Sequence, residues 1–227
     1  VFEGPQTREG YLEVQIARSR SKFQFCKVSI DDVARYHRII LARGQRAGTL
    51  GPILCLGTRN GREVDLFRLQ FFGPRLPRVG AALLECTGAH GFALRVPAVE
   101  ALGRSQLEPL GPASVIGVEI NPQAARSDVW VGSFDELPSQ WTRAFGVVYS
   151  NAFDHCQDPH RTMQAWKRVI RPGGYLIFCY VKGQRVQASD PVGELELGDV
   201  LELAGGELVY FHDQGSRNCY SEVIVQV

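Results

Sequence analysis

Five short apolar runs, each followed by a turn with polar residues or glycine, constrain the fold of this chain more than any other feature. They cover residues 53–56, 115–119, 129–131, 147–150 and 175–181. Runs that are almost wholly apolar are typical of parallel strands covered on both faces. Helical patterns separate several of these runs, and this alternation predicts an α/β fold with right-handed crossovers. The sequence therefore predicts a doubly wound, mostly parallel sheet.

Three helices can be placed from caps and apolar spacing. The first is expected to begin after the N-cap Ser29 and to end near Gly44. A second carries the apolar stripe of residues 64, 67 and 71, and a third begins at Asp158-Pro159 and is closed by residues 172–174.

The end of the chain has a different pattern. Residues 208–212 and 221–227 are two strand-like runs that flank a segment with Gly215 and Asn218. This arrangement predicts a hairpin, so the last strand should be antiparallel to its neighbour.

The remaining segments suggest how the chain is organised. Residues 1–50 are expected to form an N-terminal arm and helix, with extended pieces at 11–16 and 23–28, and residues 51–227 the main domain. The crossover of about 65–114 contains five prolines and is too long for one helix, so it is interpreted as an insertion with short helices at 80–86 and 97–103.

Charge and hydropathy exclude several functions. The formal net charge is +1, so no strong overall field attracts nucleic acid or anionic lipid. Residues 1–50 are mildly basic, with 9 Lys and Arg against 5 Asp and Glu. No apolar run approaches the ~18 residues that a membrane span needs.

The six cysteines point to a reducing environment. No two are spaced as CxxC, which argues against a zinc ribbon or a thioredoxin-like site, and Cys55 and Cys179 lie inside apolar runs. We therefore expect a cytoplasmic protein. The chain starts without Met, and a removed targeting segment is not excluded.

In a doubly wound sheet, ligands bind outside the carboxyl ends of the strands, so the residues just after each strand are the informative ones. The first run is followed by a turn flanked by Gly57 and Gly61. A dinucleotide-binding G-x-G-x-x-G turn would also need glycine at 59 and 62, and both are arginine. The turn either lets a ligand approach the backbone or serves packing alone.

The next two strand ends carry groups that suit a nucleoside. Glu119 ends the second run, where a carboxylate can accept hydrogen bonds from a ribose diol; the alternative is a surface acid. Ile120 can lie flat against an adenine. Ser133, Phe134 and Asp135 follow the third run and can line the edge of the base, although Asp135 can equally cap a short helix.

The densest polar cluster, residues 150–159, follows the fourth run. Asp154 and His155 are candidates for a general base, with a purely structural role for His155 as the alternative. A metal site would also need Asp158 and His160. We expect no metal, because Asp158 is used as a helix cap.

Together these features resemble the class I S-adenosylmethionine-dependent methyltransferases of the small, type-11-like group. The resemblance covers about residues 52–180, and the order and strand-end placement of the motifs carry it. The motifs are residues 56–61, Glu119, residues 132–134, Ser150-Asn151 with His155, Asp158-Pro159 and residues 167–176.

The resemblance implies a Rossmann-like, seven-stranded sheet with an antiparallel last strand, and S-adenosyl-L-methionine as cofactor. It implies that the turn of Gly57, Thr58, Arg59, Asn60 and Gly61 passes the methionine end. Glu119 would hold the ribose hydroxyls, Ile120 and Phe134 would flank the adenine, Ser133 would meet its edge, and Asn151 and Ala152 would lie near the sulfonium.

Three positions depart from the family pattern. The family usually has an acid where Cys55 stands, glycine where Arg59 stands and aspartate where Ser133 stands. Each departure is expected to weaken cofactor binding. Arg59, however, offers a charge-assisted bond to the carboxylate of the cofactor that glycine cannot make.

The function favoured by this resemblance is transfer of a methyl group from S-adenosylmethionine to a small-molecule acceptor, with His155 or Asp154 as base. One alternative is an RNA or protein methyltransferase that uses the basic residues 1–50. Another is a catalytically silent binding module with this fold. A nicotinamide-dependent oxidoreductase fits the fold but not the glycine spacing. The oligomeric state stays open.

Overall fold

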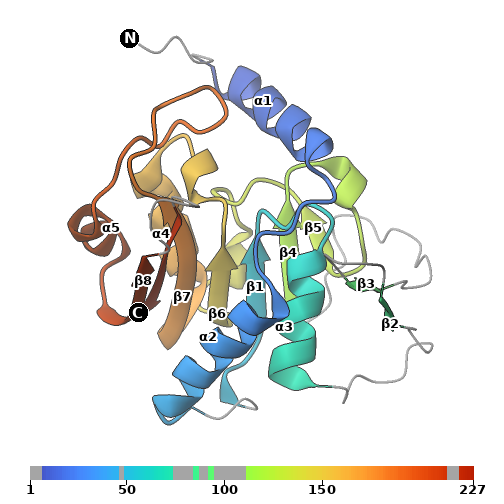
Figure 1. The fold of residues 1–227 in the computed structure, drawn as a ribbon, viewed down its shortest axis with the longest axis vertical. Helices are drawn as coiled ribbons and strands as arrows, with labels where there is room; N and C mark the ends of the chain where they lie inside the picture. The colour runs from blue at the N-terminus through green and yellow to red at the C-terminus, as the bar shows by residue number, and fades with distance from the viewer. Residues whose placement is uncertain (1–6, 46–48, 74–83, 87–91, 95–110, 214–219) are drawn as a thin grey trace.

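A seven-stranded sheet forms the centre of the computed structural model, which describes residues 7–45, 49–73, 84–86, 92–94, 111–213 and 220–227 (Figure 1). The strand order is β5-β4-β1-β6-β7-β9-β8. In this order the strands are Val129–Val131, Val115–Glu119, Ile53–Leu56, Phe145–Ser150, Ile170–Val181, Tyr220–Gln226 and Glu207–Asp213.

The strand directions confirm the predicted sheet. β5, β4, β1, β6 and β7 pair in parallel, and β9 pairs antiparallel with both β7 and β8. All four residues of β1 are buried, as expected for a central strand with helices on both faces.

The period-two alternation of the strands divides the core into two layers. Ile53 and Cys55 face α2 (Ile30–Ala42) and α3 (Arg62–Phe72), whereas Leu54 and Leu56 face α4 (Pro159–Val169) and α5 (Leu197–Ala204). Three 3-10 turns, Pro122–Ala124, Ser139–Trp141 and Phe153–His155, connect these elements. Among the described residues, no helix is both long and apolar enough to cross a membrane.

The predicted caps of α2 and α4 are confirmed. Ser29 and Asp32 form a reciprocal capping box, and Gly44 follows α2 with a φ of 79°. The Asp158 side chain accepts from Arg161 N at 3.0 Å. The expected turn at 172–174 instead lies within β7, because β6 already pairs with this strand from Ile170 onward.

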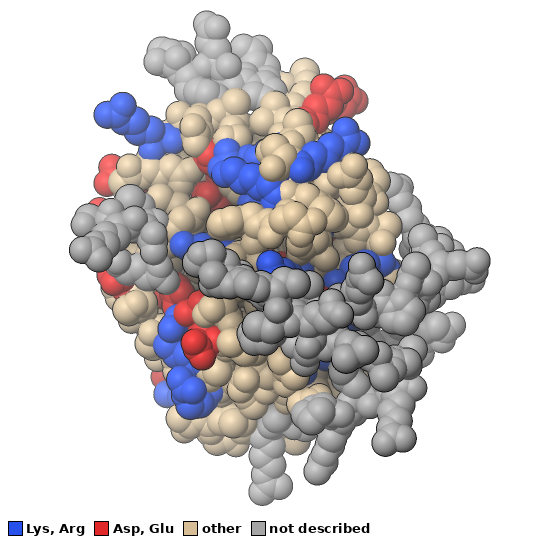
Figure 2. All heavy atoms as spheres, turned by 45° about the vertical axis from the view of Figure 1, so that its right-hand side comes forward, with Lys and Arg blue, Asp and Glu red and all other residues tan. Residues whose placement is uncertain are grey.

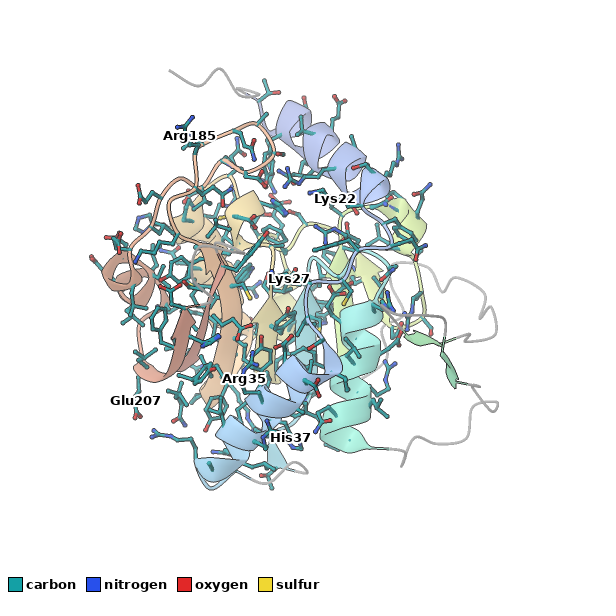
Figure 3. The ribbon with its side chains drawn as sticks, viewed as in Figure 1. Lys22, Lys27, Arg35, His37, Arg185 and Glu207 are labelled. Atoms are coloured by element: carbon teal, nitrogen blue, oxygen red, sulfur yellow. The ribbon has the colours of Figure 1, made fainter. Side chains whose placement is uncertain are left out.

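Ion pairs join α2 to the C-terminal strands. Arg35, labelled in Figure 3, lies 2.6 Å from Glu222 and 2.8 Å from Asp32. Arg43 lies 2.6 Å from Glu207 at the start of β8.

The prediction that residues 11–16 are extended is wrong, because they belong to helix α1 (Arg8–Ser21). The Thr7 side chain caps this helix by accepting from Gly10 N at 3.2 Å. Its buried residues Tyr11, Gln15 and Ser19 are spaced four apart, which places them on one helical face. This face binds polar loops rather than a sheet, so it lacks the apolar stripe that marks a helix in sequence.

Two further predictions in the connecting segments are wrong. Residues 23–28 form no strand: a turn closed by Phe25 N and Lys22 O begins there, and the residues pair with no described strand. Leu84–Cys86, predicted as helical, is strand β2 and pairs antiparallel with β3 (Phe92–Leu94). The pairing of backbones overrides the weak local preference of so short a run. Residues 80–83 and the expected helix at 97–103 lie outside the described residues.

Trp166 of α4 connects the core to one strand-end loop. It is fully buried and packs edge-on against Phe134, Phe153 and Phe178, with ring centroids 5.7–6.4 Å apart. Its indole Nε1 donates to Phe134 O at 3.1 Å. The loop after β5 is therefore held by the same side chain that fills the α4 layer.

We expect Trp166→Ala to lower the free energy of unfolding by about 3–5 kcal/mol, because it leaves a large cavity and removes the indole donor. Urea unfolding measures this loss. Val186→Ala is the matched control, since Val186 is 46% exposed and should change stability by less than about 0.5 kcal/mol. Equal effects of the two substitutions would contradict the assignment of Trp166 to the core.

Candidate functional site

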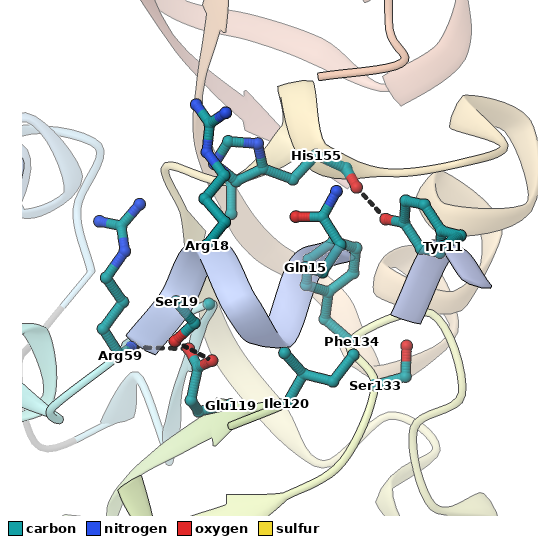
Figure 4. Close-up of a pocket in the computed structure, with 12 residues that line it drawn as sticks. Tyr11, Gln15, Arg18, Ser19, Arg59, Glu119, Ile120, Ser133, Phe134 and His155 are labelled. Atoms are coloured by element: carbon teal, nitrogen blue, oxygen red, sulfur yellow. Dashed lines mark hydrogen bonds between the residues drawn. The ribbon is translucent and has the colours of Figure 1, made fainter. Parts of the chain in front are cut away.

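A cavity opens at the carboxyl ends of β1, β4, β5 and β6, beneath helix α1 (Figure 4). Its empty volume is about 510 Å³, including the part open to solvent. Its walls come from two sources, the strand-end loops and α1. The lining residues are Tyr11, Gln15, Arg18, Ser19, Gly57, Arg59, Glu119, Ile120, Ser133, Phe134, Ala152 and His155.

The glycine turn after β1 brings backbone to the cavity wall. Gly57 has a φ of 74°, and a Cβ atom there would lie only 2.7 Å from the Cβ of Ala152. Arg59 has a φ of 47°, a left-handed conformation that is uncommon for a residue with a side chain. Such backbone strain is often found at functional sites.

Glu119 at the end of β4 is a buried acceptor that faces the cavity, and only 3% of its surface is exposed. Its Oε2 accepts from Arg59 N at 2.7 Å, and its Oε1 accepts from Asn121 N at 3.1 Å. Oε1 also accepts from the Ser19 hydroxyl of α1 at 2.8 Å (Figure 4). This carboxylate therefore already binds a hydroxyl group inside the cavity.

The loops after β4 and β5 supply an apolar wall. Ile120 and Phe134 line the cavity together with Ser133. The Ser133 hydroxyl donates to Asp135, whose carboxylate also receives the guanidinium of Arg8 at 3.1 Å. Burial alone would raise the pKa of Asp135, but these hydrogen bonds hold it below its usual value. Asp135 thus fixes α1 to this loop and caps no described helix.

The segment after β6 places His155 in the cavity wall beside two acids. His155 Nδ1 lies 2.7 Å from Asp190 Oδ1, 3.7 Å from Asp154 Oδ1 and 3.1 Å from Ser189 O. Asp154 is buried, and burial raises the pKa of its carboxyl. No local sequence signal points to Asp190, because 34 residues separate its neighbour Ser189 from His155.

Helix α1 contacts the loops after four different strands. Besides the bonds of Ser19 and Arg8, its Tyr11 hydroxyl donates to His155 O, and its Arg18 lies 2.9 Å from Asp190. Tyr11, Gln15, Arg18 and Ser19 are the lining residues that sequence reasoning missed. Their helical spacing is the signal that could have found them. Without an apolar stripe, however, this spacing does not distinguish a helix from an extended segment.

The structure brings eight of the predicted site residues to the cavity and leaves five beside it. Gly57, Arg59, Glu119, Ile120, Ser133, Phe134, Ala152 and His155 line the cavity. Thr58, Asn60, Gly61, Asn151 and Asp154 do not. Arg126 of the loop before β5 binds the carbonyl oxygens of Asn60 and Gly61, which keeps this part of the turn against the protein.

Asp154, His155 and Asp190 have ligand atoms within 4.8 Å of one another, a spacing that suits a metal ion. However, the Arg18 guanidinium already supplies a positive charge 2.9 Å from Asp190. Asp158, considered as a ligand from the sequence, is the N-cap of α4. We assign no ion to this group.

The chemical groups that line the cavity suit those of a nucleoside joined to an amino acid. Glu119 binds a hydroxyl, as it would in a ribose, and Ile120 with Phe134 offers apolar contact to a base. At the other end, Arg59 Nη1 is buried and has no hydrogen-bond partner among the described residues. Such a guanidinium suits a carboxylate.

Glu63, in the first turn of α3, is a buried acid close to the glycine turn that sequence reasoning also missed. It is 1% exposed, and within the described residues neither carboxylate oxygen has a hydrogen bond. Burial raises its pKa to about 7, against the attraction of Arg59. The nearby Cys26 thiol donates to Val28 O instead.

We expect Glu63→Gln to raise the free energy of unfolding more at pH 8 than at pH 4.5. The folded pKa of Glu63, about 7, lies above the usual 4.5, so folding becomes less favourable as the pH rises between these values. Glutamine removes this loss, on the order of 3 kcal/mol. Urea unfolding at both pH values measures it, with the exposed Glu136→Gln as control. An equal effect at both pH values would refute the buried-acid assignment.

Comparison with known proteins identifies one domain of the chain. Residues 99–178 match the family model described as a methyltransferase domain. A glycine/sarcosine/dimethylglycine N-methyltransferase of Actinopolyspora halophila is 38% identical over 76 residues, which cover 33% of this chain and 12% of that protein. The chain thus spans only a small part of this curated relative.

Solved structures share the fold. The 1,6-didemethyltoxoflavin-N1-methyltransferase of Burkholderia thailandensis, with bound 1,6-didemethyltoxoflavin and S-adenosylhomocysteine, has a TM-score of 0.61 and 12% identity. The alignment covers 100% of this chain and 92% of that one. An S-adenosylmethionine-dependent methyltransferase of Mesorhizobium loti has a TM-score of 0.52 and 13% identity, over 88% of this chain and 100% of that one.

The strand order, the single antiparallel strand of the seven-stranded sheet and the matched domain agree with one another. The chain therefore has the fold of the class I S-adenosylmethionine-dependent methyltransferases, and its residues 99–178 match a methyltransferase domain.

Proposed function

We propose that the chain transfers a methyl group from S-adenosyl-L-methionine to a small-molecule acceptor. The observation that carries this proposal is the buried Glu119 carboxylate, which binds a hydroxyl within the strand-end cavity. The family match and the methyltransferases with the same fold support the cofactor.

In this proposal, residues along the cavity contact successive parts of the cofactor. Glu119 takes the ribose hydroxyls, Ile120 and Phe134 contact the adenine, and Ser133 lies at its edge. The turn of residues 57–61 passes the methionine end, where Arg59 meets the carboxylate. Asn151 and Ala152 flank the sulfonium side.

The bound cofactor supplies an activated methyl group, so the protein has to align the acceptor and exclude water. Helix α1 supports both tasks, since it covers the cavity and contacts the loops after β4, β5, β6 and β7. His155, with Asp154 beside it, is the candidate base for an acceptor that loses a proton.

A small acceptor is favoured over nucleic acid because several basic residues of the N-terminal segment are already paired. Arg8, Arg18, Arg35 and Arg43 each form an ion pair with an acid. On the face seen in Figure 2, Lys and Arg are interspersed with Asp and Glu. By their names, the relatives described above methylate glycine, sarcosine and dimethylglycine in one case and 1,6-didemethyltoxoflavin in the other.

Two further points complete the proposal. Residues 51–227 form the catalytic domain with an insertion at about 65–114, and residues 1–50 supply its cover and a supporting helix. The protein works in the cytoplasm, in line with the free thiols of Cys26, Cys55, Cys156 and Cys179.

We expect Glu119→Gln to weaken S-adenosylhomocysteine binding about tenfold or more, because hydrogen bonds to a charged acceptor contribute ~1.5–3 kcal/mol. Isothermal titration calorimetry measures the affinity. Glu136→Gln, with a half-exposed side chain outside the cavity, should bind as the unchanged protein does. Failure of the unchanged protein to bind either S-adenosylmethionine or S-adenosylhomocysteine would refute the proposed function.

We expect Ser19→Ala to bind S-adenosylhomocysteine about two- to tenfold more tightly, because a ribose hydroxyl no longer competes with the Ser19 hydroxyl for Glu119. Ser21→Ala is the control on the same helix end, since its hydroxyl bonds to Arg18 O outside the cavity. Weaker binding by Ser19→Ala than by the control would mean that Ser19 holds the ligand instead of competing with it.

A further inference from the structure

Asp190, in the loop between β7 and α5, makes the shortest polar contact of the His155 ring. Its Oδ1 lies 2.7 Å from His155 Nδ1, and its side chain is 2% exposed. The other oxygen, Oδ2, accepts from Ser189 Oγ at 3.0 Å and from Gln187 Nε2, and it lies 2.9 Å from Arg18 Nη1. The carboxylate is therefore held from its own loop and from α1.

These contacts determine which ring nitrogen carries hydrogen. Nδ1 hydrogen-bonds to Ser189 O at 3.1 Å and makes an ion-pair contact with Asp190 Oδ1 at 2.7 Å, and both oxygens are acceptors. Nδ1 must then be the protonated nitrogen of the neutral ring, which leaves a lone pair on Nε2. In the described part of the chain Nε2 has no hydrogen bond, and His155 lines the cavity (Figure 4).

The two acids beside the ring differ in their ionisation. Burial alone would raise the pKa of Asp190, but hydrogen bonding and attraction from His155, with the charge of Arg18, lower it to about 2. Burial raises the pKa of Asp154, which lies 1.0 Å farther from Nδ1, at 3.7 Å against 2.7 Å. Asp190 is thus the ionised partner of the imidazole at neutral pH.

We propose that Asp190 is a positioning residue that holds His155 with Nε2 toward the cavity, so that the site accepts a methyl acceptor carrying a dissociable proton: a hydroxyl, a thiol or a heterocyclic N–H. Arg18 of α1 fixes Asp190 in this arrangement. The proposal rests on the proposed methyl transfer and assigns the chemical class of its acceptor.

The step balances with the groups at the site. The acceptor oxygen, sulfur or nitrogen forms a bond to the methyl carbon while the carbon–sulfur bond breaks, and that electron pair remains on sulfur. The proton of the acceptor moves to His155 Nε2. The resulting imidazolium is stabilised by the Asp190 carboxylate and later releases its proton to solvent.

Nitrogen-15 NMR of the histidine side chains tests the positioning role without an acceptor. His155→Gln identifies the His155 signals among those of the five histidines. We expect the Nδ1–H tautomer in the unchanged protein and a shift toward Nε2–H in Asp190→Ala. Glu194→Gln, an exposed acid in the same loop, should leave the signals unchanged. An Nε2–H tautomer in the unchanged protein, or no shift in Asp190→Ala, would overturn the proposal.

A methyl-transfer panel of phenols, thiols, N–H heterocycles, tertiary amines and thioethers tests the acceptor class. We expect product from the first three classes only, and for such an acceptor Asp190→Ala should lower kcat about a hundredfold. Its affinity for S-adenosylhomocysteine should change less than twofold, since Asp190 does not line the cavity. Product from a tertiary amine or a thioether would overturn the acceptor class, whereas lack of cofactor binding by the unchanged protein would overturn the proposed function instead.

Discussion

The parallel pairing of β4, β1 and β6 is the constraint on which the site depends. Leu56 pairs with Val118 on one side and with Ser150 on the other, so all three strands end at the same level. The residues that follow, Gly57, Glu119 and Asn151, are therefore neighbours although they are far apart in the sequence. Ligand-binding groups gather at this edge because parallel strands present their carboxyl ends together.

The two N-terminal helices are held to the rest of the molecule by different kinds of interaction. α2 buries Val33, Tyr36 and Ile40 in the apolar layer, so its position follows from the hydrophobic effect. α1 buries a mostly polar face and is held by hydrogen bonds and ion pairs to strand-end loops. Because a ligand hydroxyl or water can replace such bonds, α1 belongs functionally to the cavity and α2 belongs to the core.

Two buried charges without full partners lie at the glycine turn. Glu63 and Arg59 are both buried, and within the described residues Glu63 has no hydrogen bond and Arg59 Nη1 has none. Desolvated charges of this kind reduce stability and are seldom kept by a fold alone. Both charges lie beside Gly57, at the end of the cavity that suits an amino-acid group. We therefore attribute the loss of stability to the function of this end of the cavity.

The sequence by itself determined the sheet and the strand-end positions of Gly57, Glu119, Ser133 and His155. These follow from local signals: apolar runs of strand length, caps such as Ser29 and Asp158, and glycine turns. The tertiary structure decided what no local signal encodes. Asp190 meets His155 only because the loop after β7 folds back to the end of β6. Helix α1 covers the cavity only because its polar face finds partners on four loops, and a polar face carries no periodic apolar pattern from which it could be predicted.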